Sequence, residues 1–247
     1  TQSAPYSIGI EEEVMLLDPQ DFSLAQSAGE IMPALSTGLS AHATGETHQA
    51  AIELASAPHP DAAAAAREIA SLRVMLAHDL RNFGKQAASA GTHPFAIWTE
   101  TEISDSSRHQ LVYDSMRELA RREPTFALHV HVGVPDPERA IALQNVLRSH
   151  VPLLLAASVN SPFWQGRDSG LSSARIPVFK AFPRVGIPRR FASYASWVEA
   201  VDVLLRSGAF PEPTFLWWDV RPQPKFGTIE LRVMDAQTNA RETGMLA

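Results

Sequence analysis

The chain contains no cysteine among its 247 residues. This absence excludes disulfide bonds, thiolate metal sites and cysteine nucleophiles, and it is typical of proteins from a reducing cytosol. Long apolar runs are also missing, because the longest one, 151–159, contains a proline and is far shorter than the roughly 20 residues that cross a membrane. No basic start followed by an apolar run indicates a signal peptide. We therefore expect a soluble, cytoplasmic protein that has no membrane partner.

An excess of positive charge is also missing. The formal net charge of −6 and the pI of about 5.8 argue against a nucleic-acid partner. The small cluster of Arg184, Arg189 and Arg190 is better explained as a solvated loop. The sequence has no GxxxxGKS/T loop, no GxGxxG after a strand, no HExxH and no GxSxG. A bound nucleotide would therefore have to be held through metal ions on carboxylates.

The hydrophobic content of 45% supports one large domain over residues 1–247, and the predicted elements are of the mixed α+β kind. Asp61 and Asp136 are expected N-caps, and Gly91 is an expected helix stop. Residues 160–190, rich in Gly, Pro, Ser and Arg, predict a long ordered loop. The predicted strands cover about 6–17, 46–56, 128–134, 215–220 and 228–234. The predicted helices cover about 30–35, 61–90, 104–122, 136–159 and 196–207.

Four segments alternate strictly between apolar and polar residues, as strands with one buried face do. Their apolar sides predict the back of one shared sheet, and their polar sides predict a front lined by carboxylates and histidines. Glu12 falls on the apolar side, where we expect a bulge or a sheet edge. The polar sides carry Glu11 and Glu13, Glu53, His129 and His131, and Glu230 and Arg232.

Each of these pairs is open to more than one explanation. Two carboxylates on one strand face repel each other unless a cation lies between them, and Mg²⁺ prefers such oxygen ligands, but solvated acids on an edge strand fit the Glu-x-Glu pair too. The His-x-His pair fits zinc ligation, a magnesium or phosphate contact, or simple packing. The Glu-x-Arg pair is either a structural ion pair or part of a metal and phosphate site.

Two further stretches carry polar groups that suit a binding site. Glu46 and His48 lie just before Glu53 and either project into the same cavity or decorate a loop. The segment 160–175 offers many hydrogen-bond donors and ends at Arg175, a composition that suits a carboxylate or a phosphate.

Several of these stretches form a series in a fixed order across nearly the whole chain. They are GIEEE at 9–13, HVHVGV at 129–134, NSPFWQG at 160–166 with SSAR at 172–175, WDVRP at 218–222 and FGTIELRVMD at 226–235. Together they resemble the carboxylate-amine ligase family related to glutamate–cysteine ligase type 2. Each stretch is weak alone, but their joint order is highly specific.

The resemblance implies a glutamine-synthetase-like α+β fold, in which a curved, mainly antiparallel sheet has helices packed on its back. It implies that the sheet holds ATP and about two or three divalent cations, and that these cations are Mg²⁺ or, alternatively, Mn²⁺. It further implies that ATP activates a glutamate side-chain carboxylate as an acyl phosphate. An amine such as cysteine then forms the amide, and ADP and phosphate are released.

The resemblance also implies roles for single residues. Arg232 would neutralise the transferring phosphoryl group and Glu46 would lie near the attacking amine. Arg175 would contact a substrate carboxylate or phosphate, and His129 would contact the nucleotide phosphates or join the metal ligands. The implied metal ligands are Glu11, Glu13, Glu53, His131 and Glu230.

Two other functions remain as alternatives. A zinc-dependent hydrolase would use the His-x-His strand together with further ligands. A non-catalytic relative would keep the fold and bind a nucleotide or an amino acid. Family members usually continue with a further helical segment, and we expect this chain, which stops at Ala247, to lack it. The sequence leaves the amine and the presence of a homo-oligomer open.

Overall fold

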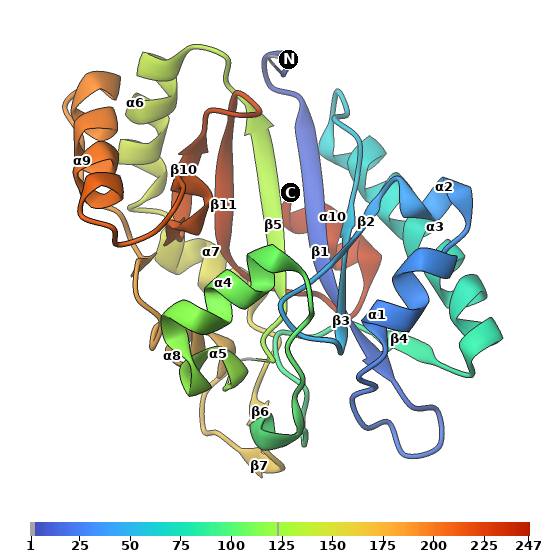
Figure 1. Ribbon diagram of the computed structural model, residues 1–247. Helices are drawn as coiled ribbons and strands as arrows, with labels where there is room; N and C mark the ends of the chain where they lie inside the picture. Colours follow the sequence, from blue (N-terminus) through green and yellow to red (C-terminus); the bar gives the residue numbers. More distant parts are fainter. Residues whose placement is uncertain (1–2, 123) are drawn as a thin grey trace.

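The computed structural model describes residues 3–122 and 124–247. Its centre is a seven-stranded sheet in the order β10-β11-β5-β1-β3-β2, with β4 also paired to β1 (Figure 1). Every pairing in this sheet is antiparallel. The strands are β1 (Ile8–Leu17), β2 (Ala43–Gly45), β3 (Ala51–Ala55), β4 (Gln86–Ala88), β5 (Ala127–Gly133), β10 (Val220–Gln223) and β11 (Thr228–Asp235). The predicted α+β class with a mainly antiparallel sheet is confirmed.

Helices lie on both sides of this sheet. Figure 1 shows α4 (Ser107–Met116), α5 (Glu118–Arg121) and α8 (Arg175–Phe179) in front of the sheet, and α7 (Val151–Ser158) and α10 (Ala240–Leu246) behind it. The remaining elements are one long helix, which packs behind the sheet against β1 and β3, and several shorter elements. They are α1 (Ala28–Ile31), α2 (Thr37–Ser40), α3 (Ala62–Leu80), α6 (Pro137–Leu147), α9 (Tyr194–Arg206), β6 (Phe163–Trp164), β7 (Arg167–Asp168), β8 (Val185–Gly186), β9 (Trp217–Trp218) and the 3₁₀ turns η1 (Met32–Ala34), η2 (Arg81–Phe83), η3 (Trp98–Glu100) and η4 (Pro213–Phe215).

The main core lies on the back of the sheet, where the alternation in the sequence places the apolar residues. Ile10 of β1, Val130 of β5 and Ile229 of β11 are buried there. Helix α3 contributes a stripe at helical spacing that includes Ile69 and Leu76, both fully buried. A second core, in front, joins α4 and α9 to the aromatic segment 179–217. This second core covers part of the front of the sheet, and Glu11, Glu13 and Glu53 remain partly exposed there.

Glu12 corrects one sequence-based expectation. Its neighbours on β3 and β5 keep regular register, so the residue lies neither at a bulge nor at a sheet edge. The fully buried carboxylate accepts two parallel bonds of 2.8 Å from the Nε and Nη2 atoms of Arg73, and a third from the Thr243 hydroxyl. An arginine fork on α3 thus satisfies the charge inside the apolar back layer.

Several predicted boundaries were wrong. The helix predicted over 61–90 ends at Leu80, because Gly84 adopts a left-handed conformation (φ 60°) and the chain returns as β4 to pair with β1. The helix predicted over 136–159 is two helices, α6 and α7, bent by 65°. Val151 begins the second helix, and Pro152 in its first turn could not continue the first helix. Among the described residues no single helix is long and apolar enough to cross a membrane, and α6 with α7 reaches that length only as a bent pair.

The segments 104–122, 160–190 and 215–220 also differ from their predictions. The first is divided into α4 and α5 at Arg117, whose φ is 53°. The long loop contains the β6–β7 hairpin, the helix α8 and the strand β8. The strand expected over 215–220 is interrupted at Asp219, and the two halves are β9 and β10. Sequence periodicity does not detect such short elements, because a helix of four or five residues makes little more than one turn and a strand of two residues completes only one alternation.

Candidate active site

Strand register brings the predicted polar residues into one row across the front of the sheet. Glu11 of β1 lies opposite His129 of β5, and Glu13 of β1 lies opposite Glu53 of β3. On the other side of β5, His131 lies opposite Glu230 of β11. The row therefore runs over four adjacent strands that come from distant parts of the chain.

Within this row, three groups of side chains place their potential ligand atoms within 4.8 Å of one another. Glu11 belongs to two of the groups, and so does Glu53. The groups are Glu11 with His131 and Glu230, Glu11 with Glu53 and His129, and Glu13 with Glu46 and Glu53. Each group contains at least two carboxylates, the donor set that hard divalent cations prefer.

Two carboxyl groups of the row, those of Glu53 and Glu46, have raised pKa values. Burial raises the pKa of Glu53 well above its ordinary value, and the neighbouring Glu11, Glu46 and Glu13 raise it further. Burial and the nearby Glu13 raise the pKa of Glu46 to about 8. Carboxylates that resist ionisation for this reason favour a bound cation, which would remove the repulsion between them.

Two histidines stabilise the charge on Glu11. Burial opposes ionisation of Glu11, but hydrogen bonds from His129 and His131 outweigh it and lower its pKa. His129 donates from Nδ1 to a Glu11 oxygen at 3.2 Å, which leaves a lone pair on Nε2 when the ring is neutral. Burial, assisted by Arg232, lowers the pKa of His129 and favours that neutral ring. Its buried Nε2 has no protein partner among the described residues.

His131 is held differently. Its Nδ1 lies 3.0 Å from the Thr228 hydroxyl, and its Nε2 lies 3.3 Å from Glu11 and 4.0 Å from Glu230. Burial opposes protonation of the ring, but the bond to Glu11 outweighs burial and raises the pKa of His131. Nε2 therefore faces the carboxylates of one group directly.

Glu230 lies between two arginines, one of which the sequence did not assign. Arg221 of β10 donates to Glu230 from Nε at 2.7 Å, and Arg232 contacts the other carboxylate oxygen. Burial opposes the charge, but Arg232 and then Arg221 outweigh it and hold the pKa of Glu230 well below its usual range. Arg221 also donates to the Thr214 carbonyl at 3.0 Å, which fixes its orientation.

A bulge in β11 sets the direction of Arg232. The pairing with β5 shifts register between Leu231 and Met234, so Arg232 and Val233 together occupy the position opposite His129. The Arg232 amide donates to the Asp219 carbonyl at 2.8 Å, where the neighbouring strand is interrupted. Bulges redirect side chains in this way beside functional sites. The buried Nε of Arg232 has no protein partner in the described part of the chain.

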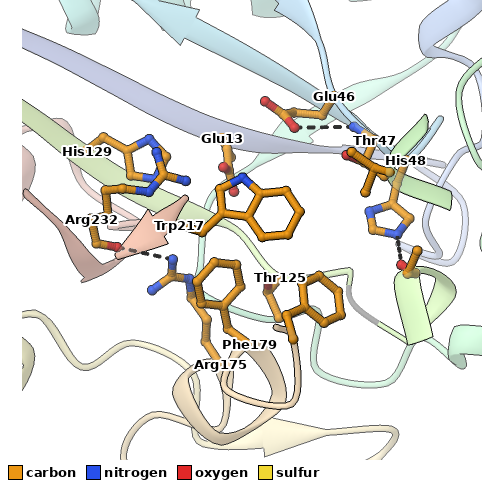
Figure 2. Close-up of a pocket in the computed structure, with 13 residues that line it drawn as sticks. Glu13, Glu46, Thr47, His48, Thr125, His129, Arg175, Phe179, Trp217 and Arg232 are labelled. Atoms are coloured by element: carbon orange, nitrogen blue, oxygen red, sulfur yellow. Dashed lines mark hydrogen bonds between the residues drawn. The ribbon is translucent and has the colours of Figure 1, made fainter. Parts of the chain in front are cut away.

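Arg175 begins α8 and is buried beside the bulge. Its Nη1 donates to the Val233 carbonyl at 3.2 Å. Its Nη2 donates to the Arg232 carbonyl at 3.3 Å (Figure 2). A guanidinium has five N–H groups, so about three remain for a ligand. One of them, on Nε, is buried and has no partner among the residues that the structure describes. An anion would satisfy these donors.

Two cavities flank the row. The first, which we call the arginine cavity, is about 110 Å³ and is lined by both Arg175 and Arg232. Figure 2 shows the Glu46 carboxylate and the Arg175 guanidinium on opposite sides of it, with His48 far from His129. The second, the Phe226 cavity, is about 260 Å³, is mostly apolar and reaches Glu11 and His131.

The sequence did not identify the aromatic lining of the arginine cavity. Phe179, Phe182 and Trp217 form part of its wall, and they come from α8, the loop after it and β9. Phe182 and Trp217 are in aromatic contact, with ring centroids 6.1 Å apart. No spacing rule connects residues of such short elements, so only the fold could assemble this wall.

The fold and the site define an α+β protein in which an antiparallel sheet carries clustered carboxylates beside arginines. A family model described as glutamate-cysteine ligase family 2 matches residues 7–247. The chain belongs to this family, as its sequence motifs indicate. A relative from Rubrobacter xylanophilus is 41% identical over 236 residues, and one from Herpetosiphon aurantiacus is 38% identical over 243. The names of both contain glutamate–cysteine ligase 2.

These matches cover 96% and 98% of this chain, which spans 63% of the length of each relative. Two solved structures share the fold. A bifunctional glutathione synthetase from Pasteurella multocida has a TM-score of 0.72 at 14% identity, covering 93% of this chain and 35% of its own. A glutamate–cysteine ligase from Francisella tularensis, solved in complex with AMP, has a TM-score of 0.59 at 14% identity, covering 95% and 62%.

Proposed function

We propose that this chain carries the site of an ATP-dependent ligase, which couples the side-chain carboxylate of glutamate to an amine such as cysteine. The observation that carries the proposal is the row of three overlapping carboxylate groups with Arg232 and Arg175 at one side. Phosphoryl transfer depends mainly on positioning and on neutralising charge. Membership in the glutamate–cysteine ligase family supports the same reaction.

The residues present fit divalent cations, Mg²⁺ or Mn²⁺. Glu13 and Glu53 would hold one, and Glu11, His131 and Glu230 would hold another. His129, assigned from the sequence to the nucleotide phosphates, offers a lone pair on Nε2 that suits a cation equally well. When bound, such cations screen the negative charge of the phosphates.

Each cavity would take a different substrate. The mostly apolar Phe226 cavity touches Glu11 and His131, and it suits the base of a nucleotide whose phosphates point toward the row. The related ligase in complex with AMP supports nucleotide binding in this fold. The arginine cavity, with its free guanidinium donors, suits the anionic amino acid substrates.

The chemistry would proceed in two steps. An oxygen of the glutamate carboxylate attacks the terminal phosphorus of ATP, the bond to the ADP oxygen breaks, and Arg232 neutralises the phosphoryl charge. The amine nitrogen then attacks the acyl carbon, and phosphate leaves. Glu46 would accept the proton that the amine releases. Burial and Glu13 raise its pKa to about 8, and cations bound between the carboxylates would lower that pKa, so that Glu46 is ionised and able to act as a base near neutral pH.

No observation favours the zinc hydrolase. Among the described residues, His129 and His131 belong to different groups and do not converge on one ligand position. Oxygen atoms dominate every group, and zinc sites prefer more nitrogen or sulfur. Elemental analysis of the purified protein tests this directly, because stoichiometric zinc that is lost on His131→Ala would favour the hydrolase.

The ligase proposal is tested by ADP release. Purified protein with ATP, Mg²⁺ and glutamate should release ADP faster when cysteine or another accepted amine is added. Glu13→Gln should abolish this release, whereas the matched change Glu30→Gln, at an exposed position outside the row, should not. Nucleotide binding without turnover across a broad panel of amines would instead identify a non-catalytic binding protein.

A further inference from the structure

Asp235, the last residue of β11, is a buried carboxylate outside the metal row. One oxygen accepts from the Asn160 amide at 2.9 Å and from the Ser161 hydroxyl at 2.6 Å. The other accepts from the Ser173 hydroxyl at 3.0 Å. A single carboxylate therefore holds both ends of the segment 160–173, which contains the exposed β6–β7 hairpin.

Arg175 belongs to the same network of contacts around Asp235. The Arg175 amide donates to the Ser161 hydroxyl oxygen at 3.2 Å, so the hydroxyl that binds Asp235 also binds the first residue of α8. Nη1 of Arg175 lies 3.8 Å from Asp235, close enough for electrostatic attraction. The Val233 and Arg232 carbonyls, just before Asp235 on the same strand, fix the guanidinium.

The opposite side of Asp235 is closed by a glycine. A Cβ added to Gly91 would lie 2.6 Å from the Asp235 Cγ, much closer than such atoms approach. The Gly91 amide also donates to the Asn160 carbonyl at 3.0 Å. The close approach of this backbone leaves the carboxylate no room to move away from the serines.

We infer that Asp235 is a positioning residue that sets Arg175 for substrate binding, acting through Ser161, Ser173 and the start of α8. The inference rests on the role proposed above for Arg175 as the group that binds the substrate anion. Asp235 itself reaches neither cavity, since it lines neither of them. We therefore expect Asp235 to affect substrate binding only through the position of Arg175.

A double-mutant cycle separates this role from a general effect on folding. We expect Asp235→Asn to raise the KM for glutamate about tenfold with little change in kcat, because the loss falls on binding. Arg175→Gln should raise it at least as much. In the double variant, Asp235→Asn should add nothing, because the arginine through which it acts is gone. Additive effects on KM would overturn the inference and leave the role of Arg175 intact.

Arg175→Gln with an unchanged KM for both glutamate and ATP would overturn the role of Arg175, and this inference with it.

Ser173→Ala removes only one of the three bonds to Asp235, so it tests the inference even when Asp235→Asn does not fold. Ser173→Ala should raise the KM for glutamate by a few-fold, and an unchanged KM would count against the inference. Thr238→Val is the matched control, since it removes a 3.1 Å bond to Asn160 in the same region without contacting Ser161, Ser173 or Arg175.

Discussion

Glu13 and Glu53 lie directly opposite each other across β1 and β3, with both carboxylates on the front of the sheet. Like charges in directly opposed positions destabilise a sheet. Glu46 completes the group within 4.8 Å, and the pKa values of Glu53 and Glu46 are raised by burial and by their neighbours. Ionising all three carboxylates therefore creates electrostatic repulsion at this point in the metal-free protein, and a cation would relieve it.

The first prediction concerns the pH dependence of the metal-free protein. Native Glu46 keeps its proton up to about pH 8 because burial and Glu13 raise its pKa, whereas the ordinary value is 4.5. Between these values the native state binds more protons than the unfolded state, so this group makes stability fall as pH rises. Glu46→Gln should remove that fall. With a chelator present, the variant should match wild type near pH 4.5 and exceed it by about 1–3 kcal/mol above pH 8 in urea unfolding. An equal pH profile for both proteins would contradict the prediction.

The second prediction concerns stabilisation by metal. A cation that binds only the native state raises its stability by about 2.7 kcal/mol at a concentration one hundred times its Kd. Saturating Mg²⁺ should therefore raise the Tm of the wild-type protein by several degrees. Glu13→Gln should lose most of this rise and yet remain folded, because the change removes one charge of a repelling group. Thermal unfolding with and without Mg²⁺ measures both quantities, and an undiminished rise in the variant would exclude Glu13 as a ligand.

The third prediction concerns the buried pair behind the row. Removing one partner from a buried ion pair leaves an uncompensated charge and costs about 3–5 kcal/mol. Arg73→Met should therefore destabilise the protein strongly, since it leaves the Glu12 carboxylate buried and also frees the Gln237 and Thr238 carbonyls. Adding Glu12→Leu should recover part of the loss, because no charge then remains. Denaturant unfolding of the single and double variants tests this, and a double variant less stable than Arg73→Met would contradict it.

The fourth prediction concerns Arg232. Arg232→Lys keeps the charge but replaces the planar fork by a single ammonium group. We expect kcat for ADP release to fall about 10²–10³-fold, the range seen when one group that stabilises a transition state is removed. Lys225→Arg, an exposed change of the same kind beside Phe226, is the matched control and should leave kcat unchanged. Wild-type kcat in Arg232→Lys would exclude phosphoryl neutralisation by the guanidinium.

The sequence predicted the row of polar residues better than it predicted the elements around it. Strand period two is a local property, so Glu11, Glu13, His129 and His131 could be assigned to one face before any partner strand was known. Arg73 could not be predicted as the partner of Glu12, because the two residues lie 61 positions apart and meet only through packing.

The sequence by itself determined which side chains of each strand share a face, and the ordered motifs determined the family. Tertiary structure decided how the faces align. It placed Glu53 in two of the three groups, introduced the bulge of β11 at Arg232, and brought Asp235 next to Arg175. The physical reason is that register and loop placement depend on contacts between distant segments, whereas the alternation of side chains is set by the geometry of a single strand.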